Sequence, residues 1–334
     1  MKLLIVGCGS IGRRHAANAA GLAEVGLLDA EPGRAAGLAE EIAAQAFPDL
    51  DAALAWGPQA AVVAAPNDQH LPLARRLVEA GLHLLIEKPI SHSLEGVAPL
   101  LEQAELRGCR LYVGCNMRYH PGPATLRAAL PEIGRPLFAR AHFGHYLPNM
   151  RPDRDYRELY CAQRARGGGT ILDSIHELDY LAWLLGPVEQ VSCAAGRLSD
   201  LEIDVEDYAG ITLRHESAAC SEVHLDYLQR FKRRGCEIVG SAGTLIWQSE
   251  GKSPERCSVR LHAEGAWREL QTSDAVDGNA PYAEMLRAFL EAVGGGGESE
   301  RLLTARQARN DLAIALAALA AAESGSRQNV EWLR

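Results

Sequence analysis

The segment LLIVGCGSIG, residues 3–12, places four apolar residues directly before three glycines with the spacing G-x-G-x-x-G. This pattern, between a short apolar strand and a helix, is typical of a dinucleotide-binding turn. The first glycine permits the tight turn, the second lets a pyrophosphate approach the backbone, and the third lets the helix pack closely on the strand. The helix N-terminus then presents free N–H groups to the phosphates. We therefore predict a phosphate-binding loop made of Gly7, Gly9, Ser10, Ile11 and Gly12; the alternative is a turn with incidental glycines.

An acidic residue follows at the position where such a domain binds the adenosine ribose. Asp29 ends the second predicted strand, 24–29, where a carboxylate accepts hydrogen bonds from the ribose hydroxyls. A carboxylate also repels a 2′-phosphate, so the predicted cofactor is NAD. Arg34 lies close enough in sequence to neutralise that charge, which keeps NADP as the alternative.

Strand and helix signals alternate over the first 115 residues or so and then change. Short apolar strands alternating with helices predict βαβ units and a doubly wound parallel sheet, a Rossmann domain, over residues 1–117. Beyond it, one helix is predicted over 170–185, followed by seven strand-like runs between 188 and 270 and by helices over 281–293 and 304–323. The fold class is therefore α/β. Residues 118–334 are predicted to form an α+β domain with a large, mainly antiparallel open sheet, and the closing helix 304–323 is expected to pack back on the Rossmann domain.

The charge and amino-acid composition of the chain limit the kinds of partner that it can bind. The chain has 334 residues, and 43 acidic against 34 basic side chains give a net charge of −9. That balance disfavours nucleic acid and anionic membranes as partners. No run reaches the ~20 apolar residues of a membrane helix, and the first apolar run is too short for a signal peptide. Eight scattered cysteines without a C-x-x-C pair favour free thiols, so we expect a cytoplasmic protein.

Polar residues follow two further predicted strands of the first domain. Glu87-Lys88-Pro89 ends the strand at 83–86, at the sheet edge where ligands of such domains bind. The Lys88 ammonium is suited to polarising a substrate oxygen; the alternative is a surface lysine. Pro66, Asn67 and His70 follow the strand at 60–64 and are predicted at the same edge. Their alternatives are a helix cap for Asn67 and a surface histidine for His70.

A second group of polar residues lies on the predicted helix after Gly167-Gly168-Gly169. Asp173 and His176 are spaced i, i+3 and so share a face, which Tyr180 extends. A carboxylate beside an imidazole is suited to proton transfer, whereas the alternative is a solvated polar face. No third ligand is obvious, so no metal is predicted. Arg118 and the charged loop 151–166 are further candidates for substrate binding, with packing and a solvated surface as their alternatives.

Together, the glycine motif, Glu87-Lys88-Pro89, and the three glycines before Asp173 and His176 resemble the glucose–fructose oxidoreductase, inositol dehydrogenase and rhizopine catabolism (Gfo/Idh/MocA) family. The resemblance covers nearly the whole chain and includes Pro66-Asn67-Asp68-Gln69-His70. It implies NAD(P)-dependent oxidation of a sugar, cyclitol or sugar derivative, and homo-oligomers, dimers or tetramers, formed through the open sheet. In one departure, two residues separate Asp173 from His176, where many members have three.

The resemblance implies roles for these residues. His176 removes the hydroxyl proton while hydride leaves the same carbon, Lys88 holds the reacting oxygen, and Asp173 orients the pair; Arg118 joins these three in substrate binding. Glu87 and Lys88 join Asp29, Pro66, Asn67, His70 and the glycine loop in cofactor binding. Two alternatives share the fold: a non-catalytic regulator that senses the cofactor, and a transhydrogenase-like enzyme with permanently bound cofactor.

Overall fold

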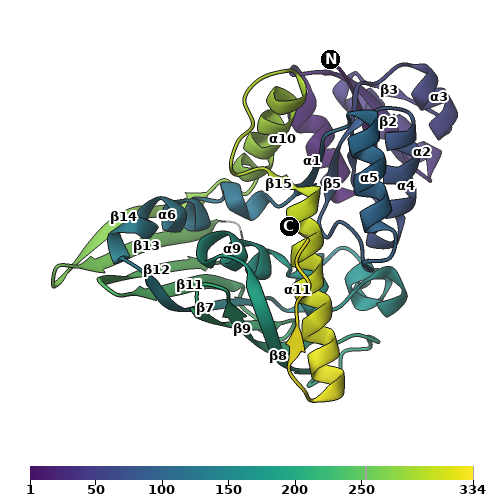
Figure 1. The fold of residues 1–334 in the computed structure, drawn as a ribbon. Coiled ribbons are helices and arrows are strands. Elements are labelled where there is room, and N and C mark those ends of the chain that lie inside the picture. Colours follow the sequence, from purple (N-terminus) through teal and green to yellow (C-terminus); the bar gives the residue numbers. More distant parts are fainter. Residues whose placement is uncertain (253, 334) are drawn as a thin grey trace. The chain divides into compact units, whose positions relative to one another are not determined.

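The computed structural model describes residues 1–252 and 254–333. They divide into two compact units, each taken by itself below (Figure 1). Unit 1 consists of Met1–Tyr119 and Asn279–Arg309, and unit 2 of His120–Gly278 and the chain from Asn310 onward. Residues 279–309, which the sequence assigns to the second domain, thus belong to unit 1. The reason is that the apolar face of α10, Ala280–Val293, lies in the core of unit 1 through Met285, Leu286 and Phe289.

Unit 1 contains a seven-stranded sheet in the order β15-β6-β5-β4-β1-β2-β3. The first six strands in the sequence are parallel, and the short β15 pairs antiparallel with β6. The strands are β1 Lys2–Val6, β2 Glu24–Leu28, β3 Gln45–Ala46, β4 Ala60–Val63, β5 His83–Glu87, β6 Leu111–Gly114 and β15 Leu303–Thr304. The order reverses between β1 and β4, and ligands of such sheets bind at this switch point, beyond the carboxyl ends of the strands.

The helices of unit 1 connect these strands as parallel pairing requires. They are α1 Ser10–Ala19, α2 Pro32–Ile42, α3 Leu50–Ala55, α4 Asn67–Glu79, α5 Val97–Arg107 and α10, with the 3₁₀ turn η1 Asn116–Tyr119. The predicted Rossmann domain is confirmed. The sequence did not predict β3 and α3, because elements of two and six residues are too short to show a periodicity.

Unit 2 contains a nine-stranded sheet in the order β14-β13-β12-β11-β7-β10-β9-β8-β16. All its neighbours are antiparallel except β7 and β10, so the predicted mainly antiparallel sheet is also confirmed. Its strands are β7 Pro136–Gly144, β8 Val188–Gly196, β9 Tyr208–His215, β10 Cys220–Asp226, β11 Arg233–Gly240, β12 Gly243–Glu250, β13 Glu255–Ala263, β14 Ala266–Val276 and β16 Gln328–Asn329. Alternate residues of β7 and β11 are buried, so one face of the sheet carries the core.

The helices of unit 2 include α6 Pro121–Ala129, α7 Leu147–Met150, α8 Thr170–Asp173 and α9 His176–Leu185. The 3₁₀ turns η2 Leu130–Ile133, η3 Tyr156–Glu158, η4 Tyr160–Ala162 and η5 Arg164–Arg166 complete the set. The final helix, α11 Ala305–Ser324, begins in unit 1 and continues into unit 2. In the described part of the chain, no helix has the length and apolar character needed to cross a bilayer.

The helix predicted over 170–185 is interrupted in the structure. It divides into α8 and α9 at Ser174 and Ile175, where Ser174 has φ −99° and ψ 33°. The second segment restarts with hydrogen bonds from the N–H groups of Leu178 and Asp179 to the carbonyl of Ile175. The i, i+3 relation of a continuous helix therefore does not describe how Asp173 and His176 lie.

Candidate active site

The glycine turn after β1 is shaped by two steric constraints. Gly7 has φ +95°, and a Cβ there would lie 2.6 Å from the carbonyl oxygen of Ala64; a Cβ on Gly12 would lie 1.7 Å from the carbonyl oxygen of Gly7. Gly9 differs, because a Cβ on it would meet nothing within 4 Å. Gly9 caps α1 without a side-chain hydrogen bond, and the first N–H groups of a helix lack helical acceptors. The turn therefore fits a pyrophosphate approaching over Gly9.

Asp29 is held beside this turn at the end of β2. Its carboxylate accepts hydrogen bonds from the backbone N–H of Cys8 at 2.6 Å and of Glu31 at 2.8 Å, and from the guanidinium of Arg34 at 3.0 Å. Arg34 also pairs with Glu31 at 2.5 Å. Burial raises the pKa of Cys8 to about 11, so this thiol stays protonated. Three donors thus hold the carboxylate beside the glycine turn, and Arg34 offsets part of its charge.

His70 connects the two loops that carry Asn67 and Lys88. One ring nitrogen lies 2.8 Å from the carbonyl oxygen of Pro89, and the other lies 2.8 Å from that of Ala65. The ring is fully buried, and this burial lowers its pKa. The surface-histidine alternative is therefore wrong. His70 braces the turn after β5, in which Lys88 is joined to Pro89 by a cis peptide bond, and Asn67 begins α4 as a buried residue.

Glu87 has a partner that the sequence did not indicate. Its carboxylate lies 2.8 Å from Nε2 of His15, which is fully buried on α1. The same carboxylate occupies the space that a side chain at Gly114 would need, since a Cβ there would lie 2.8 Å from Oε1 of Glu87. Glu87 thus links β5 to the helix of the glycine turn. The sequence feature that could have indicated this contact is a histidine, His15, three residues after Gly12.

In unit 2, the loop of three glycines packs against Glu206. A Cβ on Gly169, which has φ +108°, would lie 2.4 Å from Oε1 of Glu206, and the same carboxylate accepts from the N–H of Ile171 at 3.0 Å. A Cβ on Gly168 would lie 2.5 Å from the carbonyl oxygen of Tyr160. Burial raises the pKa of Glu206. These contacts fix the start of α8, the short helix that ends with Asp173.

Asp173 accepts a hydrogen bond from the hydroxyl of Tyr160 at 2.6 Å. Burial, and secondarily the Asp173 charge, raise the pKa of Tyr160 well above its usual value, so the phenol is a stable donor. Tyr160 belongs to the charged loop that the sequence named only as a candidate. The structure therefore assigns Asp173 a partner outside its own helix.

His176 is the first residue of α9, and its side chain is buried. Glu177 and Tyr180, on the same helix, are fully buried as well, so a solvated polar face is excluded. Glu177 forms an ion pair with Arg234 of β11 at 2.8 Å. The sequence did not predict this pair, which ties the first turn of α9 to the sheet.

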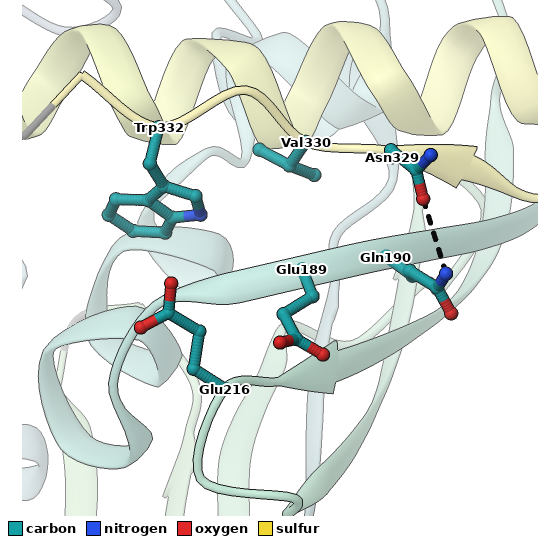
Figure 2. A pocket seen from close by; sticks show the side chains of 6 residues that line it. All are labelled: Glu189, Gln190, Glu216, Asn329, Val330 and Trp332. Carbon is teal, nitrogen blue, oxygen red and sulfur yellow. Dashed lines mark hydrogen bonds between the residues drawn. The ribbon is translucent and has the colours of Figure 1, made fainter.

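The predicted residues are divided between the two units. The glycine loop, Asp29, Pro66, Asn67, His70, Glu87, Lys88 and the buried Arg118 of η1 lie in unit 1, and Asp173 and His176 lie in unit 2. Among the described residues, no three His, Cys, Asp or Glu side chains come together as a metal site. An open hollow of about 450 Å³ in unit 2 contains none of the predicted residues (Figure 2). It is lined by Glu189, Gln190, Glu216, Asn329, Val330 and Trp332.

Comparison with known proteins agrees with this architecture. Residues 1–115 match the oxidoreductase family with an NAD-binding Rossmann fold, and residues 126–246 match the Gfo/Idh/MocA C-terminal domain. The chain belongs to the Gfo/Idh/MocA family of oxidoreductases.

Individual relatives cover almost all of the chain. It is 31% identical over 342 residues to the myo-inositol dehydrogenase Hyg17 of Streptomyces leeuwenhoekii, covering 98% of both. It is similar to the structure of UDP-N-acetylglucosamine 3-dehydrogenase from Acidithiobacillus ferrooxidans, with 25% identity, a TM-score of 0.78 and coverage of 97% and 98%. Its fold is also that of a levoglucosan dehydrogenase in complex with NADH, with 18% identity, a TM-score of 0.86 and full coverage of both chains.

Proposed function

We propose that this protein is an NAD-dependent dehydrogenase that interconverts a hydroxyl and a keto group on a cyclitol, sugar or sugar derivative. The observation that carries the proposal is the glycine turn, where Gly9 leaves the helix N-terminus open to a pyrophosphate and Asp29 is held beside it. The relative that is a myo-inositol dehydrogenase, matched over 98% of both chains, favours a polyhydroxylated ring as substrate.

The chain supplies the acid–base groups of the reaction. The His176 imidazole accepts the proton of the substrate hydroxyl, while the Lys88 ammonium donates a hydrogen bond to the same oxygen and stabilises its developing negative charge. Asp173, held by the Tyr160 hydroxyl, orients the reacting groups. NAD, when bound, accepts the hydride that leaves the carbon, which becomes a carbonyl.

Unit 1 provides the cofactor site in this proposal. The N–H groups of Ser10, Ile11 and Gly12 receive the pyrophosphate, and Asp29 accepts from the ribose. The loops containing Pro66, Asn67 and Glu87 shape the nicotinamide end. Asp29 favours NAD, whereas its pairing with Arg34 keeps NADP as the alternative.

We further propose that the protein acts in the cytoplasm as a homo-oligomer formed through the outer face of the nine-stranded sheet. The eight cysteines are free thiols, as a reducing compartment allows. Phe138 and Trp267 are exposed apolar side chains on strands of this sheet. Sedimentation velocity measures the assembly, and a monomer at micromolar concentration would contradict this part of the proposal.

Paired titrations of NADH and NADPH into cofactor-free protein test the cofactor site, and NAD reduction with myo-inositol and a sugar panel tests the activity. We expect tighter NADH binding, and a loss of turnover of at least about 100-fold in His176→Asn and in Lys88→Met with NADH binding retained. The half-buried His83, at the opposite end of β5 from Lys88, provides the matched control His83→Asn. Near-normal turnover in both active-site variants would refute the assignment. NADH binding without turnover of any substrate would favour the cofactor-sensing regulator.

A further inference from the structure

Basic side chains flank the ends of three neighbouring strands, β7, β11 and β12, at one end of the sheet in unit 2. In the β11–β7 pair, Arg233 lies opposite Gly144, and this is the last pair of the ladder. Lys232 directly precedes Arg233 and His145 directly follows Gly144, so both residues stand at this end of the two strands. In the β11–β12 pair, Arg233 lies opposite Glu250, and the N–H of Gly251 donates to the carbonyl of Lys232 at 3.0 Å. Lys252 is the next residue. Gly251 is thus at the level of Lys232, and the Lys252 ammonium donates to the carbonyl of Met150 at 2.8 Å.

The side chains of Lys232 and His145 share the face of the sheet that carries the core. Side chains alternate between the faces of a strand, so Lys232 lies on the face of Arg234 and Cys236, and His145 on that of Phe143. The guanidinium of Arg234 stacks on the Phe143 ring at 4.0 Å, which places both strands' inner residues together. His145 is 9% exposed and the Lys232 side chain 17%.

Lys232 is held in place without using its full hydrogen-bonding capacity. Its ammonium donates to Glu255 at 2.7 Å, and the same carboxylate lies 3.0 Å from Nε2 of His120 and accepts from the Ser249 hydroxyl at 2.5 Å. In the described part of the chain, Glu255 is the partner of the Lys232 ammonium. Because an ammonium has three donors, two remain for a ligand.

The balance of charge around His145 is positive. The cations are Lys232, Arg234 and Lys252, and the carboxylates are Glu255 and Glu177, each engaged in an ion pair. Burial and these three cations lower the pKa of His145 to about 4, so the ring is neutral and offers one N–H donor near pH 7. Arg233 pairs with Glu250 on the opposite face of the sheet.

Arg234 connects this cluster to the predicted proton acceptor. Its ion pair with Glu177 holds the first turn of α9, and His176 is the residue directly before Glu177. The Arg234–Glu177 ion pair therefore connects the end of β11 next to Lys232 to the first turn of α9, which carries His176.

We propose that Lys232, His145 and Lys252 form a subsite for an anionic group of the substrate, a carboxylate or a phosphate ester. The inference rests on the proposed function and narrows it from sugars and cyclitols in general to their acidic derivatives. Lys232 and His145 donate hydrogen bonds to the anionic oxygens, and Lys252 supplies a second positive charge at the exposed rim.

Ligand-observed saturation-transfer NMR on the NADH-loaded protein, which detects millimolar binding, tests the subsite with three probes. D-glucose is the neutral probe, D-glucuronate carries a carboxylate and glucose 6-phosphate carries a phosphate ester. We expect at least one anionic probe to bind about tenfold or more tightly than glucose, and Lys232→Met to abolish that preference. Lys252→Gln weakens it, and because Lys252 is exposed, this variant decides the question if Lys232→Met does not fold. The control Arg256→Gln, an exposed cation elsewhere on β13, leaves the preference unchanged.

The subsite is overturned if both anionic probes bind no more tightly than glucose, or if the preference survives in both lysine variants. Preference for one anionic probe alone supports the subsite and identifies its ligand chemistry. NADH binding, measured first in the same samples, separates the two proposals. If NADH fails to bind, the proposed dehydrogenase is wrong, while the same probes on the cofactor-free chain still decide the subsite. If NADH binds without an anionic preference, the subsite alone is wrong.

Discussion

Replacing Gly12 with alanine tests whether the glycine turn is dictated by contact within the protein. The added Cβ would lie 1.7 Å from the carbonyl oxygen of Gly7, far inside any tolerated contact. That carbonyl cannot retreat easily, because Gly7 lies against Ala64 and donates its own N–H to the Leu28 carbonyl at 2.8 Å. The strand and the helix would therefore have to separate locally.

The expected cost follows from two opposing effects. Forcing a methyl into a packed position costs about 1–3 kcal/mol and occasionally more, and a backbone obstacle belongs at the upper end. Alanine within α1 regains up to about 1 kcal/mol over glycine. The net loss is at least about 2 kcal/mol, and for a unit of this size each kcal/mol lowers Tm by roughly 2–4 °C. Gly12→Ala should therefore lower Tm by about 4–8 °C.

Gly9→Ala is the matched control, because its Cβ meets nothing within 4 Å. It should change stability by less than about 1 kcal/mol and yet weaken NADH binding about tenfold, since the methyl occupies the approach of the pyrophosphate. Calorimetric unfolding and NADH titration of both variants provide the readouts. A Gly12→Ala protein that melts with the parent, or a Gly9→Ala protein that binds NADH like the parent, would refute the reasoning.

Three further predictions concern single contacts. Tyr160→Phe removes the donor to Asp173 and should lower kcat about tenfold, with Tyr156→Phe in the same loop as control; equal kcat in both would show that Asp173 does not depend on Tyr160. Asp29→Asn should raise the NADPH-to-NADH affinity ratio at least about tenfold, because the repelling charge is lost while Arg34 stays, and an unchanged ratio would mean that Asp29 does not discriminate. Because burial lowers the pKa of His70 in the folded state, its contribution to stability is complete above the unfolded value of ~6.5 and is lost as pH falls toward the folded value. In urea titrations, the free energy of unfolding of His70→Gln should thus fall less between pH 7 and pH 5 than that of the parent. Equal falls in the two proteins would show that His70 does not contribute to the pH dependence of stability.

Most of the fold follows from patterns that are local in the chain. The apolar strands, the glycine spacing and the switch from alternating helices to successive strands predict a parallel sheet followed by an antiparallel one, and both form. The helix over 170–185 was predicted as continuous because its apolar residues keep one period. It breaks at Ser174, where the chain is anchored by Glu206 on one side and by the Glu177–Arg234 pair on the other.

The sequence by itself determined which residue types stand at the ends of strands and at the start of one helix. The glycine turn, Asp29 and Lys88 follow strands, His176 follows the three glycines, and all are recognisable from their immediate neighbours. Only the tertiary structure decided their partners. His15 meets Glu87 across 72 positions, and Tyr160 reaches Asp173 from a separate loop. Lys232 and His145 stand at the same end of two paired strands because the register places Arg233 opposite Gly144. The physical reason is that strand and turn propensities depend on adjacent residues, whereas buried hydrogen bonds and ion pairs depend on which distant segments the packed core brings together.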